Sequence, residues 1–416
     1  MNKILREKIF VVADRVEEYS LYAVLFFIPI SVALVELFIG FALLAFIIKK
    51  ITFPDFTFIK SRIHFLLLVF FIFCGLSLLN SALYLNKSLI TLFFKWGKYI
   101  FVFFLAQDTL VSHQRIKNAV RVLLITGCLV VIDCFFQYFF GWEFLRGGKL
   151  IVLAGGIKAI TGPFKHYNAL AAYLVCISVL FIAAISIKSN SQFYVSLRNR
   201  VMFYGMFLGL FLLAVCLLLT FSRGGWVGFL SAGLLMLFLF GKRKFILLFF
   251  CFFMLAMVLF PMIRERAIFI FQSGGDANRF ALWRGAWAMI KERPFLGKGI
   301  GTFMPYFSSY IKGLGVQYAH NSFLQIWAET GIFALGSFLS FIALILWQGI
   351  EAFRRSQDYI TLGLLCAIFG FLVLSFFDNH LYKVQLAVLF WFMIGMLVAV
   401  SNIKNKEIIY GGISHD

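Results

Sequence analysis

The stretch Phe323–Trp347 reads FLQIWAETGIFALGSFLSFIALILW, and His320 and Asn321 stand just before it. This run is apolar and long enough to cross the hydrocarbon core of a membrane as one helix. The preceding segment, residues 264–319, is rich in arginine and glycine instead. An imidazole at such a boundary, with arginines in the loop before it, indicates chemistry on an anionic, lipid-borne substrate.

The composition of the whole chain is that of a membrane protein. Of the 416 residues, 62% are apolar, 19% aromatic and 13% charged, so a soluble domain could not cover this apolar surface with its polar residues. We therefore predict one all-α polytopic membrane domain over residues 1–416, with membrane lipids and no nucleic acid among its partners. All seven cysteines lie in apolar runs without CxxC spacing, so neither disulfide bonds nor a zinc site is expected.

The apolar runs predict where the chain crosses the membrane. We expect spans at 20–48, 63–83, 92–106, 119–140, 168–187, 201–220, 225–240, 245–262, 322–348, 359–377 and 384–400. The first run has Pro29 near its middle and is either one long helix or two short passes that meet at a turn. Two passes place the cationic N-terminus inside and give about twelve spans. Lysines and arginines of alternate loops share one side, which the positive-inside rule makes cytoplasmic.

Four notable segments then lie outside: 141–166, 220–225, 264–319 and 378–383. The large loop 264–319 precedes the third-last span and is expected to carry short amphipathic helices. These segments contain many cations: Arg146, Lys149, Lys158, Lys165, Arg223, Arg264, Arg266, Arg279, Arg284, Lys291, Arg293, Lys298 and Lys312. Orientation signals should be sparse outside, so the excess indicates an anionic ligand such as phosphate or pyrophosphate. Contact with lipid head groups is the alternative for any single lysine.

Residues 278–293 have helical periodicity, which separates two arginines. Arg279 heads an apolar stripe that continues through Trp283, Ala286, Trp287 and Ile290. Arg284 and Lys291 share a different, solvated face. Arg279 must therefore snorkel or meet a counter-charge, whereas Arg284 is expected to be structural.

Two further boundaries carry candidate residues. Arg223 lies in a short turn between two spans, where glycines permit close backbone approach, and an interfacial anchor is its alternative role. Asn321 can cap the helix that begins near Ser322, and His320 stands by the same helix end, where N–H groups favour anions. For His320 alone, an interfacial histidine is the default. Glu329 lies on the other side of this helix, so we expect it to pair with another span.

Several motifs in order make the chain recognisable: LTFSRGG at 219–225, Asn278-Arg279 with Leu282-Trp283, PFLGKGIG at 294–301, and His320-Asn321 with Gly331. Together they resemble the O-antigen ligase and polymerase superfamily. Thr161–Phe164 with Asn168 is similar to the middle-span segment of that family. The resemblance runs from about Thr161 to Gly336. Ala334 departs from the residue usual in ligases, which leaves the choice between ligase and polymerase open.

The resemblance implies a GT-C-like, inverting glycosyltransferase that works without metal or cofactor at the periplasmic face of the bacterial inner membrane. It would move a glycan from undecaprenyl pyrophosphate to lipid A-core. By motif, His320 would be the general base, while Arg223 and Arg279 would hold the pyrophosphate and should converge with it in one outward-opening cavity. Lys165, Arg146 and Asn321 are further candidates for substrate contact. The residues agree with this reading, since neither a GxxxxGK[ST] loop nor a DxD pair occurs.

Three other functions stay open. A Wzy-like polymerase would pass the glycan to a growing chain, and a protein O-oligosaccharyltransferase would pass it to a protein. A transporter would require internal repeats and charges at mid-membrane depth. Asp133 and Glu36 are the main acids within spans, too few for an ion-coupling relay.

Overall fold

The computed structural model describes residues 3–55, 61–153, 156–189, 197–241, 258, 264–265, 277–311 and 318–411. Its helices are α1 (Lys3–Phe27), α2 (Val32–Thr52), α3 (Arg62–Leu76), α4 (Leu85–Ile90), the π-helical η4 (Thr91–Gly97), α5 (Lys98–Thr109), α6 (His113–Phe140), α7 (Tyr167–Ser189), α8 (Leu197–Leu219), α9 (Arg223–Leu239), α12 (Ala277–Glu292), α13 (Phe303–Tyr310), α14 (Ser322–Ser356), α15 (Tyr359–Ser375) and α16 (Val384–Gly411). Short 3-10 turns are η2 (Ser77–Asn80), η3 (Ala82–Tyr84) and η7 (His380–Tyr382), and the hairpin β1 (Ile151–Val152) with β2 (Lys158–Ala159) is antiparallel.

The all-α membrane architecture is confirmed in its coarse form. In the described part of the chain, seven helices are long and apolar enough to cross a membrane: Val32–Thr52, Arg62–Asn80, Ala82–Thr109, His113–Phe140, Tyr167–Ser186, Ser322–Ser356 and Val384–Ile403. Three apolar helices are shorter: Tyr204–Leu219, Arg223–Leu239 and Tyr359–Ser375. The count of about twelve spans stays a prediction, and the expected span 245–262 lies almost wholly outside the described residues.

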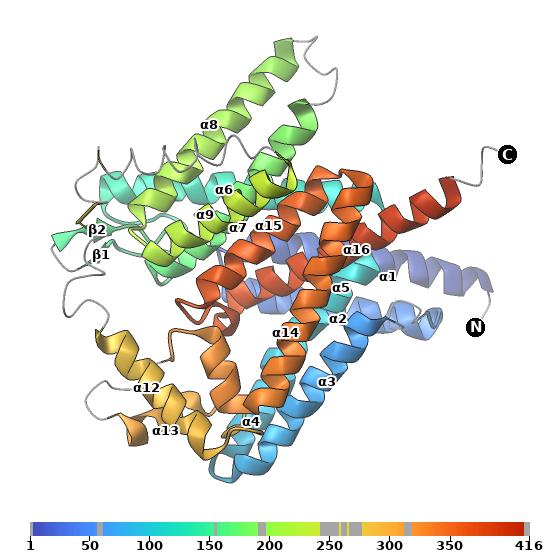
Figure 1. Cartoon of the computed structure of the whole chain (residues 1–416). Coiled ribbons are helices and arrows are strands. Elements are labelled where there is room, and N and C mark those ends of the chain that lie inside the picture. Colours follow the sequence, from blue (N-terminus) through green and yellow to red (C-terminus); the bar gives the residue numbers. More distant parts are fainter. Residues whose placement is uncertain are drawn as a thin grey trace.

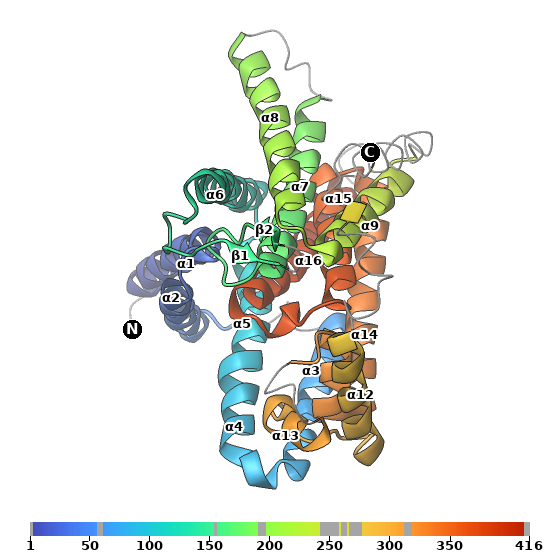
Figure 2. The same cartoon turned by 90° about the vertical axis from the view of Figure 1, so that its left-hand side faces the viewer.

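The first apolar run is two helices, as the position of Pro29 suggested. α1 ends at Phe27, and α2 begins after Ser31, whose Oγ accepts the N–H of Leu34 at 3.4 Å. α1 begins at Lys3 rather than at residue 20, and before residue 20 it carries Asp14, Glu17 and Glu18, which pair with Lys49 and Arg115. The two helices form a hairpin, and both lie at the edge of the bundle (Figures 1 and 2).

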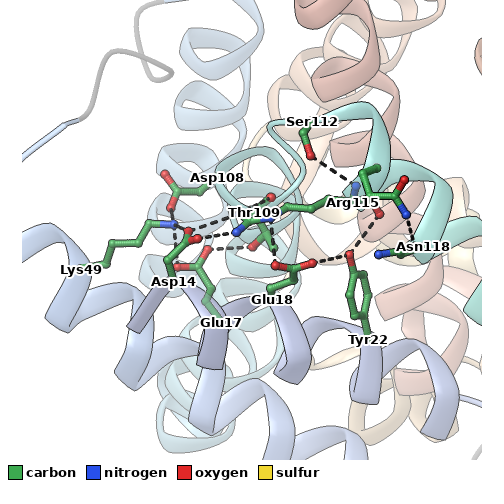
Figure 3. Close-up of polar contacts among 11 residues, drawn as sticks. Asp14, Glu17, Glu18, Tyr22, Lys49, Asp108, Thr109, Ser112, Arg115 and Asn118 are labelled. Carbon is green, nitrogen blue, oxygen red and sulfur yellow. Dashed lines mark hydrogen bonds and ion pairs between the residues drawn. The ribbon is translucent and has the colours of Figure 1, made fainter. Parts of the chain in front are cut away.

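A largely buried set of charges, the inner cluster, joins the middle of α1 to the ends of α2 and α5 and the start of α6 (Figure 3). Lys49 Nζ lies 3.0 Å from carboxylate oxygens of both Asp14 and Glu17, and 2.5 Å from Asp108. Arg115 pairs with Asp14 and, at 2.9 Å, with Glu18. Charges removed from water require such partners. The cluster brings the loops of Lys49 and Arg115 to one end of the bundle, in agreement with the predicted cytoplasmic side.

The centre of the core consists of α7, α15 and α16, whose side chains are almost all buried over residues 167–186, 359–375 and 384–403. α15 packs against α7 and α9, and small residues allow the close approach. A Cβ added at Gly370 would lie 2.9 Å from the carbonyl oxygen of Gly228, so the two backbones nearly touch. This contact fixes the start of α9 beside the end of α15, which places Arg223 near residues 376–383.

Helix α14 is interrupted at Gly331, where the backbone has φ 82°. The loop 294–301 docks at this break: Pro294 O accepts the N–H of Ile332, and Glu329 O accepts the N–H of Gly299, both at 2.9 Å. A Cβ on Gly331 would meet Phe295 O at 1.9 Å. The PFLGKGIG motif therefore closes the helix break at Gly331.

The buried carboxylate of Glu329 completes this junction. It accepts the backbone N–H groups of Gly301 at 2.9 Å and Phe303 at 3.2 Å, and the phenol O–H of Tyr382 at 3.2 Å. The expectation that Glu329 pairs with another span holds in part. Tyr382 stands just before α16, whereas two backbone N–H groups and Gln325 of the same helix donate the other hydrogen bonds.

α12 confirms the helix predicted at 278–293, but its buried face differs. Leu282, Ala286, Met289 and Ile290 are buried, whereas Trp287 is 45% exposed. The face is rotated because α12 packs on α13 and α14 (Figures 1 and 2), and a Cβ on Gly285 would meet the Phe307 ring at 2.6 Å. Arg284 is exposed, as expected.

Candidate active site

Phe221 and His320 both have left-handed backbones, with φ of 50° and 48°. Such conformations are uncommon for residues other than glycine and are often found at functional sites. Phe221 begins the turn into α9, and His320 begins the turn into α14. The two residues that follow them, Ser222 and Asn321, cap these helices with their side chains. Both candidate motifs are thus held at helix starts by a strained residue and a cap.

His320 is paired with an acid that the sequence did not single out. Its Nδ1 lies 3.1 Å from Oδ1 of Asp378, in the short segment between α15 and α16. A carboxylate only accepts, so Nδ1 carries the proton and Nε2 keeps a lone pair. The His320 side chain is 33% exposed and that of Asp378 only 4%. The imidazole is therefore oriented from its buried side and accessible on the other.

Asp378 is held in its charged form. Its Oδ2 lies 2.7 Å from Lys383 Nζ, and its Oδ1 accepts the N–H of Asn379 at 2.7 Å. Burial alone would raise the pKa of Asp378, but the charge of Lys383 and the hydrogen bond from His320 outweigh it and hold this pKa well below its usual range. Ser322 Oγ donates to Asp378 O at 3.1 Å and ties α14 to the same segment.

Arg223 is the first residue of α9 and is half-buried. Its turn is fixed on both sides. Ser222 Oγ donates to Asn168 Oδ1 at 2.8 Å, and a Cβ on Gly224 would lie 3.3 Å from Cβ of Phe377. The turn therefore touches the start of α7 on one side and the neighbour of Asp378 on the other.

Arg279 acts electrostatically on a residue of the same region, His166. Burial, then the positive charge of Lys383, and then those of His320 and Arg279 lower the pKa of His166 to about 4, against the opposing effect of Asp378. His166 directly precedes α7 and so belongs to the motif 161–168. We call His166, Arg223, Arg279, His320, Asp378 and Lys383 the outer cluster.

The remaining candidates are placed differently. Arg146 Nη1 donates to Pro163 O at 2.9 Å, which braces the loop 141–166. The Oδ1 of Asn321 accepts the N–H groups of Phe323 and Leu324, both at 3.0 Å, so its side chain acts as the helix cap. Lys165 is exposed, next to His166. Structural hydrogen bonds thus occupy Arg146 and Asn321, and a role for either in substrate contact stays a prediction.

The acids considered for a transporter have structural partners. Asp133 Oδ1 accepts the N–H groups of Phe144 at 2.8 Å and Leu145 at 3.3 Å, which fixes the loop after α6. Glu36 forms an ion pair with Lys98. These bonds give both acids a role in the fold.

Sequence reasoning missed Asp378, Lys383 and His166. The segment 378–383 was placed outside, but its six residues gave no spacing that linked them to His320, 58 residues earlier. The position of Asp378 and Lys383 could have indicated them, since an acid and a lysine stand there in a very short loop between two apolar runs.

An open cavity of about 540 Å³ lies beside Arg279 on α12. It is lined by Phe280, Trp283, Arg284, Trp287 and Leu324. Phe280 follows Arg279 in the sequence and Leu324 lies four residues after His320, but Arg279 and His320 themselves do not line the cavity. An amphiphilic ligand would find a charged and an aromatic surface side by side.

The fold and this cluster define a multi-pass helical membrane protein with a cationic, histidine-containing site at helix ends. Residues 208–339 match the family model described as O-antigen ligase, and this segment contains Arg223, Arg279 and His320. The match confirms the resemblance to the O-antigen ligase superfamily and supports a membrane enzyme of glycosyltransferase type that handles glycans. The comparison with curated proteins gave no match. Within the described ranges no group of His, Cys, Asp or Glu side chains is arranged to hold a metal ion, and a metal-free reaction stays a prediction.

Proposed function

We propose that this protein transfers a glycan from undecaprenyl pyrophosphate to an acceptor hydroxyl at the periplasmic face of the bacterial inner membrane. The observation that carries the proposal is the contact between His320 Nδ1 and Asp378, because it leaves Nε2 as a base on the exposed side of the ring. The family match over residues 208–339 supports the substrate class.

The chemistry follows from these groups. The acceptor O–H gives its proton to His320 Nε2 while its oxygen attacks the anomeric carbon, and the bond from that carbon to the pyrophosphate breaks. Attack from the face opposite the leaving group inverts the configuration. The imidazolium that forms is stabilised by the ionised Asp378, and a positioned base of this kind contributes about 10²- to 10⁴-fold to a rate.

Arg223 and Arg279 would stabilise the pyrophosphate leaving group. Negative charge develops on the pyrophosphate as the bond breaks, and guanidinium groups match its oxygens with paired donors. The apolar chain of a lipid-linked donor has a suitable surface in the aromatic wall of Trp283 and Trp287. Lys383 holds Asp378 and would add positive charge to the same region.

The acceptor is proposed to be lipid A-core, as in ligases. A polymerase is the second candidate, since Ala334 departs from the usual ligase residue. Ala334 is fully buried in the core, so its side chain is not placed to contact an acceptor. A protein acceptor is the third possibility, which the same experiment covers.

The test is reconstitution of the full chain in liposomes with a defined undecaprenyl-pyrophosphate glycan and each acceptor in turn. One transfer to lipid A-core identifies a ligase, a ladder of repeat units a polymerase, and a glycosylated protein an oligosaccharyltransferase. EDTA should leave the rate unchanged. Loss of activity in EDTA, restored by magnesium or manganese, would refute the metal-free mechanism, and the absence of product with all three acceptors would refute the proposal.

A further inference from the structure

We propose that His166 is a further ligand-binding residue of the outer cluster, a neutral imidazole whose Nε2–H donates a hydrogen bond to the pyrophosphate of the lipid-linked donor. This inference rests on the proposed function, and it assigns a role to a residue that neither the motifs nor the family match singles out.

The hydrogen bonds around His166 fix its tautomer. Its Nδ1 accepts the backbone N–H of Asn168 at 3.2 Å, and its ring lies against that of Tyr167 with 4.1 Å between centroids. An acceptor at Nδ1 places the proton of a neutral imidazole on Nε2. Among the residues that the structure describes, Nε2 has no hydrogen-bond partner. The ring therefore offers one oriented N–H donor.

The backbone places that donor between the two halves of the proposed chemistry. His166 is two residues before Asn168, which holds Ser222 and hence the turn of Arg223. Its imidazole also interacts electrostatically with Lys383, Asp378, His320 and Arg279. His166 therefore lies beside the turn of Arg223, and its ring is within electrostatic range of Arg279 and of the dyad that would deprotonate the acceptor.

The neutral ring of His166 can donate a hydrogen bond, and it does not serve as a second general base. Burial, Lys383, and the charges of His320 and Arg279 keep the pKa of His166 at about 4, so the ring is neutral near pH 7. Its lone pair is already used by Asn168, and only the Nε2–H remains for a ligand. Neutral imidazoles with lowered pKa values can polarise oxygen atoms in this way. An anionic ligand beside the ring would strengthen this hydrogen bond. Because the imidazole is neutral, it leaves no additional positive charge in the site after the ligand leaves.

The competing explanation is that His166 only caps α7, and two substitutions separate the roles. In His166→Asn the side-chain carbonyl can replace Nδ1 as the acceptor for Asn168, but nothing reaches the position of Nε2. In His166→Gln the amide nitrogen reaches that position, while the cap is lost. If Nε2–H binds the ligand, kcat/KM of the Asn variant should lie about 10- to 100-fold below that of the Gln variant, the range for a hydrogen bond to a charged group. If the cap is the whole role, the Gln variant should have the lower Tm and Asn should equal wild type in both Tm and kcat/KM.

Binding of farnesyl pyrophosphate to the detergent-purified full chain distinguishes this inference from the proposed function. Weaker binding by His166→Asn than by His166→Gln, with no glycan transfer by wild type, would support the hydrogen bond and refute the function. Normal transfer with equal affinity in the two variants would refute the hydrogen bond and leave the function. Wild-type protein that neither binds farnesyl pyrophosphate nor transfers glycan would refute both.

Discussion

The inner and outer clusters are built from the same residue types but differ in balance and exposure. In the inner cluster, Lys49 and Arg115 are surrounded by four carboxylates, and each cation meets more than one of them (Figure 3). In the outer cluster, Asp378 is the acid that interacts with His166 alongside Lys383, His320 and Arg279. The imidazole of His320, the proposed base, is 33% exposed, whereas Lys49 is buried.

This difference distinguishes structural from ligand-binding charge clusters in an apolar chain. A cluster whose cations and carboxylates satisfy each other fastens helices together, and its ligand is the protein itself. A cluster that gathers cations around one buried acid, with a basic nitrogen exposed, is suited to an external anion. The comparison can be broken by substitutions in either cluster.

The largest effect is expected at His320. His320→Ala removes the base but leaves the arginines, so transfer should fall by about 10³-fold while farnesyl pyrophosphate still binds. Turnover by the reconstituted variant and binding in detergent are the two measurements. Near-normal turnover would remove His320 from catalysis.

Asp378→Asn should have the next largest effect, a loss of about 10²-fold in kcat, because the imidazole loses both its orientation and its counter-charge. The variant should also be less stable. The pKa of Asp378 in the folded protein lies well below its ordinary value of 3.8. The charged carboxylate therefore stabilises the fold above pH 3.8, and this stabilisation is lost as pH falls through the folded pKa. Tm values of wild type and variant should therefore converge in strong acid. A constant difference down to pH 2 would show that packing, not charge, is responsible.

Arg223→Lys and Arg279→Lys should each reduce kcat/KM by about 10-fold or more, since lysine keeps the charge but loses the planar pair of donors. Arg284→Lys is the matched control on the same helix as Arg279, and its exposed side chain points to little effect. Equal tolerance at the three positions would mean that these arginines serve topology or lipid contact.

The sequence predicted the parts of this molecule that depend on local pattern. Apolar length marked most helices, Pro29 marked the break between α1 and α2, and helical periodicity marked α12. The motifs also gave the resemblance that the family match over residues 208–339 confirms. Burial within α12 was mispredicted at Trp287, because the partner surface of α13 cannot be read from a helical wheel.

The missing parts depend on contacts between distant segments. Asp378 meets His320 only because α15 packs on α9 and brings its end beside α14. The sequence predicts that Glu329 pairs with another span, yet backbone N–H groups of the loop after Pro294 donate two of its hydrogen bonds. Backbone donors have no signature in sequence, so a buried acid in an apolar run can be assigned a partner of the wrong kind.

Substitutions in the inner cluster should have the smallest effect on catalysis, and they should lower the stability of the fold instead. Lys49→Met removes the cation that pairs with the buried Glu17, while Asp14 keeps Arg115 and Asp108 keeps Lys50. Breaking a buried ion pair on one side costs about 3 to 5 kcal/mol. Tm should fall clearly, while kcat per folded molecule stays within about twofold of wild type, since the cluster is remote from the proposed chemistry. Arg355→Met is the matched control: its pair with Glu351 is exposed at 55% and 47%, so its Tm should hardly change. A Lys49 variant with normal Tm but impaired transfer would reverse the comparison and give the inner cluster the functional role.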